Sequence, residues 1–193
     1  MNKKLGTICI AVAESLTMRL SKSALISLLL SLFPLAAGAI SLDKPAPPLE
    51  TRLLNGGHYA LADHRGEVVI LNFWATWCAP CRLELPVFAA SYQAHHHEGL
   101  SVLAISLDDP EAVAEVREVA KDFSFPVSLY GDANGQNYGR IWRLPMTFII
   151  DRRGVLRVDG GRGAGIVYDS ALLEKTVGAL LAEPRPDVSP QNP

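Results

Sequence analysis

The chain has little cysteine and no excess of charge of either sign. Only three of its 193 residues are cysteines, namely Cys9, Cys78 and Cys81. Zinc usually takes four protein ligands, and no second cysteine pair exists to complete such a site, so we expect no metal. The 18 basic residues are balanced by 20 acidic ones, which gives a formal net charge of −2. The chain therefore lacks the basic footprint of a nucleic-acid-binding protein, and we expect no nucleic acid among its partners.

Charge is distributed unevenly along the chain. Residues 1–39 carry four basic residues and one acidic residue, a net +3, which leaves −5 for the remainder. A basic start, a mostly apolar run at 24–33 and the small residues 37–39 together have the pattern of an export signal. We predict that residues 1–39 are such a signal, with Met18 as an alternative start. The competing interpretation is an uncleaved membrane anchor over 24–40, which is near the lower length limit for a span. Both place the body of the protein outside the cytoplasm, in the periplasm.

The exported body keeps a single cysteine pair at C-x-x-C spacing. Closing so short a loop stabilises a fold by only about 2 kcal/mol in the loop-entropy model, so the pair is a poor structural crosslink. Two thiols one helical turn apart can instead pass two electrons as a reversible disulfide. We therefore predict that Cys78 and Cys81 form a redox-active disulfide.

Three parts follow the leader. Residues 40–48 contain three prolines and are predicted to be a stiff linker, 49–182 a folded domain, and 183–193 a disordered tail. The predicted strands are 49–54, 58–61, 68–73, 100–107, 126–130, 146–150 and 155–158, and the predicted helices are 78–97, 111–123, 134–142 and 170–182. This order predicts an α/β fold, a sheet with helices on both faces.

The cysteines follow an apolar strand and open a helix, and their roles follow from that position. A helix N-terminus favours a thiolate, which makes Cys78 the nucleophile. Cys81 lies one turn deeper and is expected to resolve the mixed disulfide. Pro80 falls in the first turn, where its missing N–H costs little. Trp77 is expected to flank the exposed sulfur and to contribute to substrate docking.

The residues around the pair carry a resemblance. They read Asn72-Phe73-Trp74-Ala75-Thr76-Trp77-Cys78-Ala79-Pro80-Cys81-Arg82-Leu83-Glu84-Leu85-Pro86. This run resembles the TlpA/ResA family of extracytoplasmic thioredoxin-like thiol-disulfide oxidoreductases, and the order of elements fits that family over residues 46–182. The resemblance implies a thioredoxin-like fold with a central mixed sheet flanked by helices, an N-terminal β-hairpin and a central strand–helix insert.

The resemblance also implies further site residues. Asn72 stands where thioredoxin has a buried acid, and Glu84 looks like the family's substitute, a catalytic acid–base group that shares a helix face with Cys81. Pro145 matches the cis-proline of the fold and would place the backbone of Leu144 beside Cys78. Arg143 and Met146 depart from the residues common in the family, and we expect both to alter the docking surface.

The implied function is the reduction of protein disulfides in the periplasm. The resemblance implies electrons from a membrane thiol transporter, no dissociable cofactor, and substrates such as apocytochrome c, copper-site assembly proteins or oxidised thiols in general. A disulfide oxidase or isomerase is the alternative within enzymes, because sequence does not fix the direction of exchange. A copper-binding assembly module is the alternative from another class. His95, His96 and His97 have the residue type of copper or nickel ligands, but cationic side chains are favoured at a helix end in any case.

Overall fold

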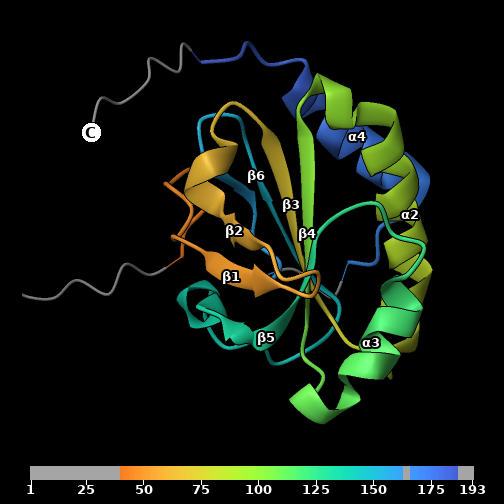
Figure 1. Ribbon diagram of the computed structural model, residues 1–193. Coiled ribbons are helices and arrows are strands. Elements are labelled where there is room, and N and C mark those ends of the chain that lie inside the picture. The colour runs from red at the N-terminus through yellow and green to blue at the C-terminus, as the bar shows by residue number, and fades with distance from the viewer. Residues whose placement is uncertain (1–39, 163–165, 187–193) are drawn as a thin grey trace, which may run out of the picture. The chain divides into compact units, whose positions relative to one another are not determined.

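The computed structural model describes residues 40–162 and 166–186 (Figure 1). The predicted export signal and residues 187–193 of the predicted tail lie outside the described residues. Within the described ranges, no helix is long and apolar enough to cross a membrane.

In this part of the chain, seven strands form one mixed sheet in the order β2-β1-β5-β4-β3-β6-β7. The strands are β1 (Glu50–Leu53), β2 (His58–Ala60), β3 (Val68–Trp74), β4 (Leu100–Ser106), β5 (Val127–Ala133), β6 (Met146–Ile150) and β7 (Leu156–Val158). Strands β3, β4 and β5 are parallel neighbours, and β6 runs antiparallel to β3. The predicted N-terminal hairpin is present as β1 and β2.

The α-helices of the described residues all pack on one face of this sheet (Figure 1). They are α2 (Ala79–His95), α3 (Val113–Ala120) and α4 (Ser170–Leu181). The chain steps from β3 to β4 to β5 in one direction across the sheet, and right-handed crossovers in one direction place their helices on the same side. Among the described residues, the other face carries short 3-10 turns, η1 (Leu61–His64) and η4 (Gly135–Tyr138), whose apolar residues pack into the second core cluster. Helical segments thus flank both faces of the sheet, with the α-helices on one face and 3-10 turns on the other.

Strand β3 shows how the two cores are built. Its side chains alternate, so that Ile70 and Trp74 face the α-helices while Leu71 and Phe73 face the 3-10 side. Every residue of β3 is buried. Asn72 is its one polar residue, and it lies on the helical face beneath α2, where it meets Glu84. A buried polar side chain in the central strand therefore marks the position of the site.

Two predicted helices are shorter than expected. The one predicted over 111–123 consists of a 3-10 turn, η3 (Pro110–Ala112), followed by the eight residues of α3. The one predicted over 134–142 is reduced to η4, because Gly139 adopts a positive φ of 79° and ends the turn. Residues 140–145 are therefore free to form the irregular loop that reaches the active site. Helix α2 ends at His95, two residues before the predicted end, and the chain continues as η2 (His96–Glu98) before Gly99.

Candidate active site

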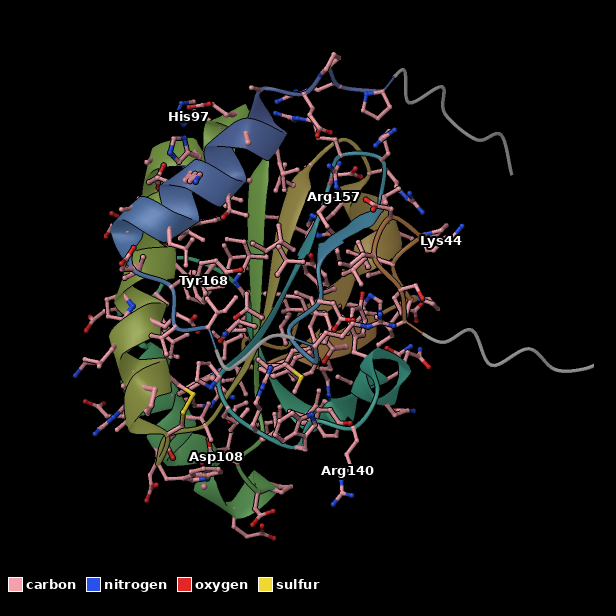
Figure 2. All side chains as sticks on the ribbon, turned by 180° about the vertical axis from the view of Figure 1, so that it is seen from behind. Lys44, His97, Asp108, Arg140, Arg157 and Tyr168 are labelled. Carbon is pink, nitrogen blue, oxygen red and sulfur yellow. A yellow bond between two sulfur atoms is a disulfide. The ribbon has the colours of Figure 1, made fainter. Side chains whose placement is uncertain are left out.

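The two cysteines lie where β3 gives way to α2. Cys78 is the N-cap of α2, and its Sγ accepts a hydrogen bond of 3.2 Å from the backbone N–H of Cys81. The two residues are joined by a disulfide bond, seen in yellow in Figure 2. Cys78 is 5% exposed and Cys81 is fully buried, so an incoming substrate reaches the sulfur of Cys78 first.

The start of α2 provides the electrostatics that Cys78 needs. Backbone N–H groups of the first turn point toward the N-cap position, and the helix dipole places partial positive charge there. The N–H of Cys81 is one such donor, and it already binds the Cys78 sulfur. Pro80 has no N–H and stands in this first turn, where none is required. A thiolate at Cys78 is stabilised by this arrangement.

Asp108 fixes the loop that precedes the disulfide, and sequence reasoning missed it. One carboxylate oxygen accepts the backbone N–H of Thr76 at 2.8 Å and the Ser106 hydroxyl at 2.6 Å, and the other accepts the Thr76 hydroxyl at 2.6 Å. The side chain is buried apart from 8% of its surface. Its position just after β4 was the available signal, because carboxyl ends of neighbouring parallel strands meet at one edge of a sheet.

Glu84 is a buried acid one turn beyond Cys81 on the same helix. It is fully buried, which excludes a solvated surface position. One carboxylate oxygen accepts the side-chain amide of Asn72 at 3.0 Å, and the other accepts the backbone N–H of Tyr168 at 3.0 Å. Burial raises the pKa of Glu84 to about 7, against the opposing effect of these two hydrogen bonds. A carboxylate of this pKa can exchange a proton near neutral pH.

Asn72 connects this acid to the strand that carries the cis-proline. Its amide nitrogen donates both to Glu84 and to the hydroxyl of Thr147 on β6, each at 3.0 Å. Its carbonyl oxygen is buried and has no hydrogen-bond partner among the described residues. A neutral amide thus holds Glu84 in place without adding a second negative charge under the disulfide.

An apolar groove opens beside Cys78. Its walls include Trp77 and Pro80 from the helix start, Leu107 from the end of β4, and Trp142 and Leu144 from the loop before β6. Trp77 is 71% exposed and Trp142 is 61% exposed, so two large apolar surfaces face solvent next to the reactive sulfur. Exposed apolar patches of this kind mark interaction sites. Trp142 was not among the residues that the sequence singled out.

Arg143 supports the Trp142 wall of the groove. Its guanidinium lies over the Trp142 ring at 4.5 Å from the ring centroid, and it donates to the carbonyl of Gly160 at 2.8 Å. A cation held over an aromatic face is favourable by about 0.5–1 kcal/mol at an exposed site. The departure from the family pattern at this position therefore shapes the groove by holding a tryptophan.

The Leu144–Pro145 peptide bond is cis. Leu144 also lines the groove, and its backbone makes no backbone hydrogen bond with any residue that the structure describes. Met146, in contrast, was expected on the docking surface and is 1% exposed. Its side chain points into the core cluster on the far face of β6, because alternate residues of a strand face opposite sides. Met146 was expected to alter the docking surface, but its side chain does not line the groove beside Cys78.

The AhpC/TSA family matches residues 42–159. The thiol-disulfide oxidoreductase ResA of Geobacillus kaustophilus is 31% identical over 119 residues, which are 62% of this chain and 68% of that protein. The chain belongs to the AhpC/TSA family, among its ResA-like thiol-disulfide oxidoreductases. The thioredoxin-like protein YneN of Bacillus subtilis is 34% identical over 115 residues, 58% of this chain and 66% of its own length. The ResA-like family predicted from the Asn72–Pro86 run is confirmed, and so is the enzyme class.

Solved structures of related proteins confirm the thioredoxin-like fold of this ResA-like chain. A thiol:disulfide interchange protein of the thioredoxin family from Chlorobium tepidum superposes with a TM-score of 0.63 at 24% identity, over 74% of this chain and 99% of its own. A secreted Mycobacterium tuberculosis disulfide oxidoreductase superposes with a TM-score of 0.56 at 20% identity, over 68% and 95% of the two chains.

The three histidines lie at the other end of α2. His95 bonds Glu98 at 3.1 Å and Glu174 of α4 at 2.9 Å. Partial burial lowers the pKa of His95, but the hydrogen bonds to the two glutamates outweigh it, so the pKa is raised overall. Within residues 40–162 and 166–186, no group of three or more His, Cys, Asp or Glu side chains is arranged to hold a metal ion.

Proposed function

We propose that this oxidoreductase works as a reductant of protein disulfides. The Cys78 thiolate attacks a substrate disulfide and releases one substrate thiol, which leaves a mixed disulfide. The Cys81 thiolate then attacks the Cys78 sulfur and releases the second substrate thiol. The substrate gains two electrons, and the enzyme is left with the Cys78–Cys81 disulfide. Glu84 accepts the proton of Cys81 for this second step.

The observation that carries the reducing direction is the buried carboxylate of Glu84 on the helix face of Cys81. Residues three apart on a helix are neighbours, so a charged Glu84 disfavours a thiolate on Cys81. Thiol-disulfide oxidoreductases that are strong oxidants stabilise their dithiol form relative to their disulfide form. A carboxylate under the dithiol has the opposite effect, because it favours the disulfide and makes the dithiol a better electron donor.

We also propose where this oxidoreductase acts and which partners it has. The basic, apolar start of the sequence supports export to the periplasm, and one structural neighbour is described as secreted. We propose protein substrates with exposed cysteine pairs, among them apocytochrome c or copper-site assembly proteins. The enzyme then needs a supply of two electrons per cycle, for which a membrane thiol transporter is the proposed donor.

The midpoint potential of the Cys78–Cys81 pair tests the direction. Equilibration of the exported form with glutathione or dithiothreitol buffers, followed by thiol labelling, gives this value. We expect a midpoint below about −180 mV, the potential of a protein disulfide isomerase. A midpoint above that value would contradict the reducing role and support an oxidase or isomerase, while leaving the exchange chemistry itself intact.

The apolar groove is the proposed docking site for an extended substrate segment. Trp77, Pro80 and Trp142 offer apolar contacts, and the free backbone of Leu144 beside cis-Pro145 can pair with the segment as a strand would.

Trp142→Ala tests this docking site. We expect the KM for a protein disulfide to rise about tenfold, because a buried aromatic contact is worth on the order of 1–2 kcal/mol. The rate with oxidised glutathione should stay the same, since so small a disulfide does not fill the groove. Leu42→Ala removes another exposed apolar side chain, one that does not line the groove, and is the control. Equal losses with both disulfides would point to a damaged site and contradict a docking role.

A further inference from the structure

A second cluster of polar groups lies at the opposite end of the sheet from the disulfide. The turns that precede β3 and β4 meet there at Gly66 and Gly99, whereas Cys78 follows the carboxyl end of β3. Figure 2 shows the separation, with His97 at one end of the molecule and Asp108 with the disulfide at the other. The mechanism uses nothing at the His97 end.

Arg152 forms the floor of this cluster. It is 4% exposed, and its guanidinium donates to the carbonyls of Gly66 at 2.8 Å, Glu98 at 2.9 Å and Leu181 at 3.0 Å. Its Nε is buried and has no hydrogen-bond partner among the described residues. No carboxylate of those residues lies within 4.0 Å of it. The direct hydrogen-bond partners of this buried cation are thus carbonyl oxygens, whose dipoles compensate a full charge only in part.

Arg185 brings a second guanidinium to the same place. It donates to the carbonyl of Glu98 at 2.9 Å, the same oxygen that Arg152 binds. A Cβ on Gly99 would lie 3.0 Å from Arg152 Nη1 and 3.2 Å from Arg185 Nη2, so the two groups flank this glycine, whose φ is +94°. Burial and the neighbouring charge of Arg185 lower the pKa of Arg152, and they outweigh the charges of Glu98, Glu183 and Glu67, which raise it. Two like charges meet here, and no carboxylate of the described residues forms an ion pair with either of them.

The carboxylates nearby have other side-chain partners. Glu67 bonds His64 at 2.7 Å, Glu98 bonds His95 at 3.1 Å, and Glu183 bonds Arg157 at 3.2 Å. None of the three forms an ion pair with Arg65, Arg152 or Arg185 in the described part of the chain. The guanidinium groups of Arg65, Arg152 and Arg185 are therefore free of direct carboxylate contacts among the described residues, although the three glutamates act on Arg152 from a longer distance.

A pocket opens over this pair of arginines. Arg65, Arg185, His96 and His97 line it together with Gly66 and Gly99, and Glu67 is its one acidic residue. Arg65 donates to a backbone carbonyl, that of Arg153, and has no carboxylate partner among the described residues. We propose that this pocket binds a phosphate-type oxyanion, held by the guanidinium groups of Arg65 and Arg185 above the buried charge of Arg152. Planar guanidinium groups match such oxygens in pairs, which favours an oxyanion over chloride. The site is independent of the disulfide chemistry and of the proposed reducing direction.

Isothermal titration of the exported form with inorganic phosphate, at constant ionic strength kept with chloride, tests the pocket. We expect saturable binding at one site. Arg65→Gln and Arg185→Gln should each weaken it about tenfold, since a charge-assisted hydrogen bond is lost in each. Both side chains are at the surface, so the variants should fold, which a thermal melt checks. Arg140→Gln changes an exposed arginine at the other end of the molecule and is the control (Figure 2). Absence of binding, or equal affinity in all three variants, would overturn the proposal.

Vesicles identify the source of the oxyanion. Sedimentation with phosphatidylglycerol vesicles, with phosphatidylcholine vesicles as reference, compares the parent protein with Arg185→Gln. Capture that phosphate competes away and that Arg185→Gln weakens supports a lipid headgroup as ligand. Phosphate binding without capture supports a free oxyanion. Capture that neither phosphate nor the substitution changes would show general surface attraction and would count against the pocket.

Discussion

Replacing Cys78 with serine should abolish disulfide exchange. The sulfur of Cys78 is the accessible member of the pair, and a serine hydroxyl at this position is not ionised near neutral pH. We expect the rate of insulin reduction to fall by about three orders of magnitude or more. The folded domain should survive, because the side chain is small and the two-residue crosslink contributes little stability.

The complementary variant, Cys81→Ser, should trap substrates. Cys78 can still attack a disulfide, but nothing resolves the mixed disulfide that forms. Extracts of the exported fraction should therefore yield covalent complexes that mass spectrometry can identify and that dithiothreitol dissolves. The Cys78→Ser variant is the matched control and should trap nothing. Complexes formed through Cys81 instead would reverse the assigned roles of the two cysteines.

Glu84→Gln should slow turnover and remove its dependence on pH near neutrality. The pKa of Glu84 is raised to about 7 by burial, so the ionised fraction that can accept the Cys81 proton grows between about pH 6 and 8. In the parent protein we expect the rate of insulin reduction to rise through this interval. The variant should be about a hundredfold slower above pH 7 and should lack this inflection. Glu111→Gln, which removes an exposed carboxylate, is the control, and an unchanged profile in Glu84→Gln would exclude proton transfer by Glu84.

The same substitution should stabilise the fold at alkaline pH. A carboxyl whose folded pKa lies above its ordinary value of 4.5 keeps its proton in the folded state after the unfolded chain has lost it. Its contribution to the free energy of unfolding therefore falls as pH rises from about 4.5 to 7. Above that range the full destabilisation by the buried charge is present. The shift corresponds to on the order of 3 kcal/mol. Urea unfolding at about pH 5 and pH 8 should show a gain for Glu84→Gln only at pH 8. If the Asn72 side-chain amide rotates by half a turn, its carbonyl oxygen can accept a hydrogen bond from the amide of the new Gln. The hydrogen bond between positions 72 and 84 is then kept.

Local sequence signals predicted the elements that carry the chemistry. The β-branched run before Cys78 predicted a buried strand, and Pro80 within the first turn predicted where the helix begins. Period and turn chemistry are short-range properties, and they also predicted the helix over 170–182, which α4 confirms at Ser170–Leu181. The helix predicted over 134–142 is present only as the turn η4. It ends at Gly139, whose positive φ does not continue a helix.

No local sequence pattern predicted the contacts between segments that are distant in the chain. Asp108 reaches back 32 residues to Thr76, and the Tyr168 backbone reaches 84 residues to Glu84. Trp142 reaches the groove from the irregular loop that precedes β6. The side of the sheet on which each α-helix packs depends on strand order, which no local pattern contains.

The sequence by itself determined the reactive pair, its place at a helix start, the family and the enzyme class. These follow from residue types at fixed short spacings, which set the local backbone and the local field of the helix. Only the tertiary structure decided that Glu84 is fully buried, that Met146 faces away from the disulfide, and that three arginines converge at the other end, none of them in an ion pair with a carboxylate of the described residues. Burial and charge pairing depend on what the fold brings together from distant parts of the chain, and the pKa of Glu84 and the unpaired charge of Arg152 exist only once it has done so.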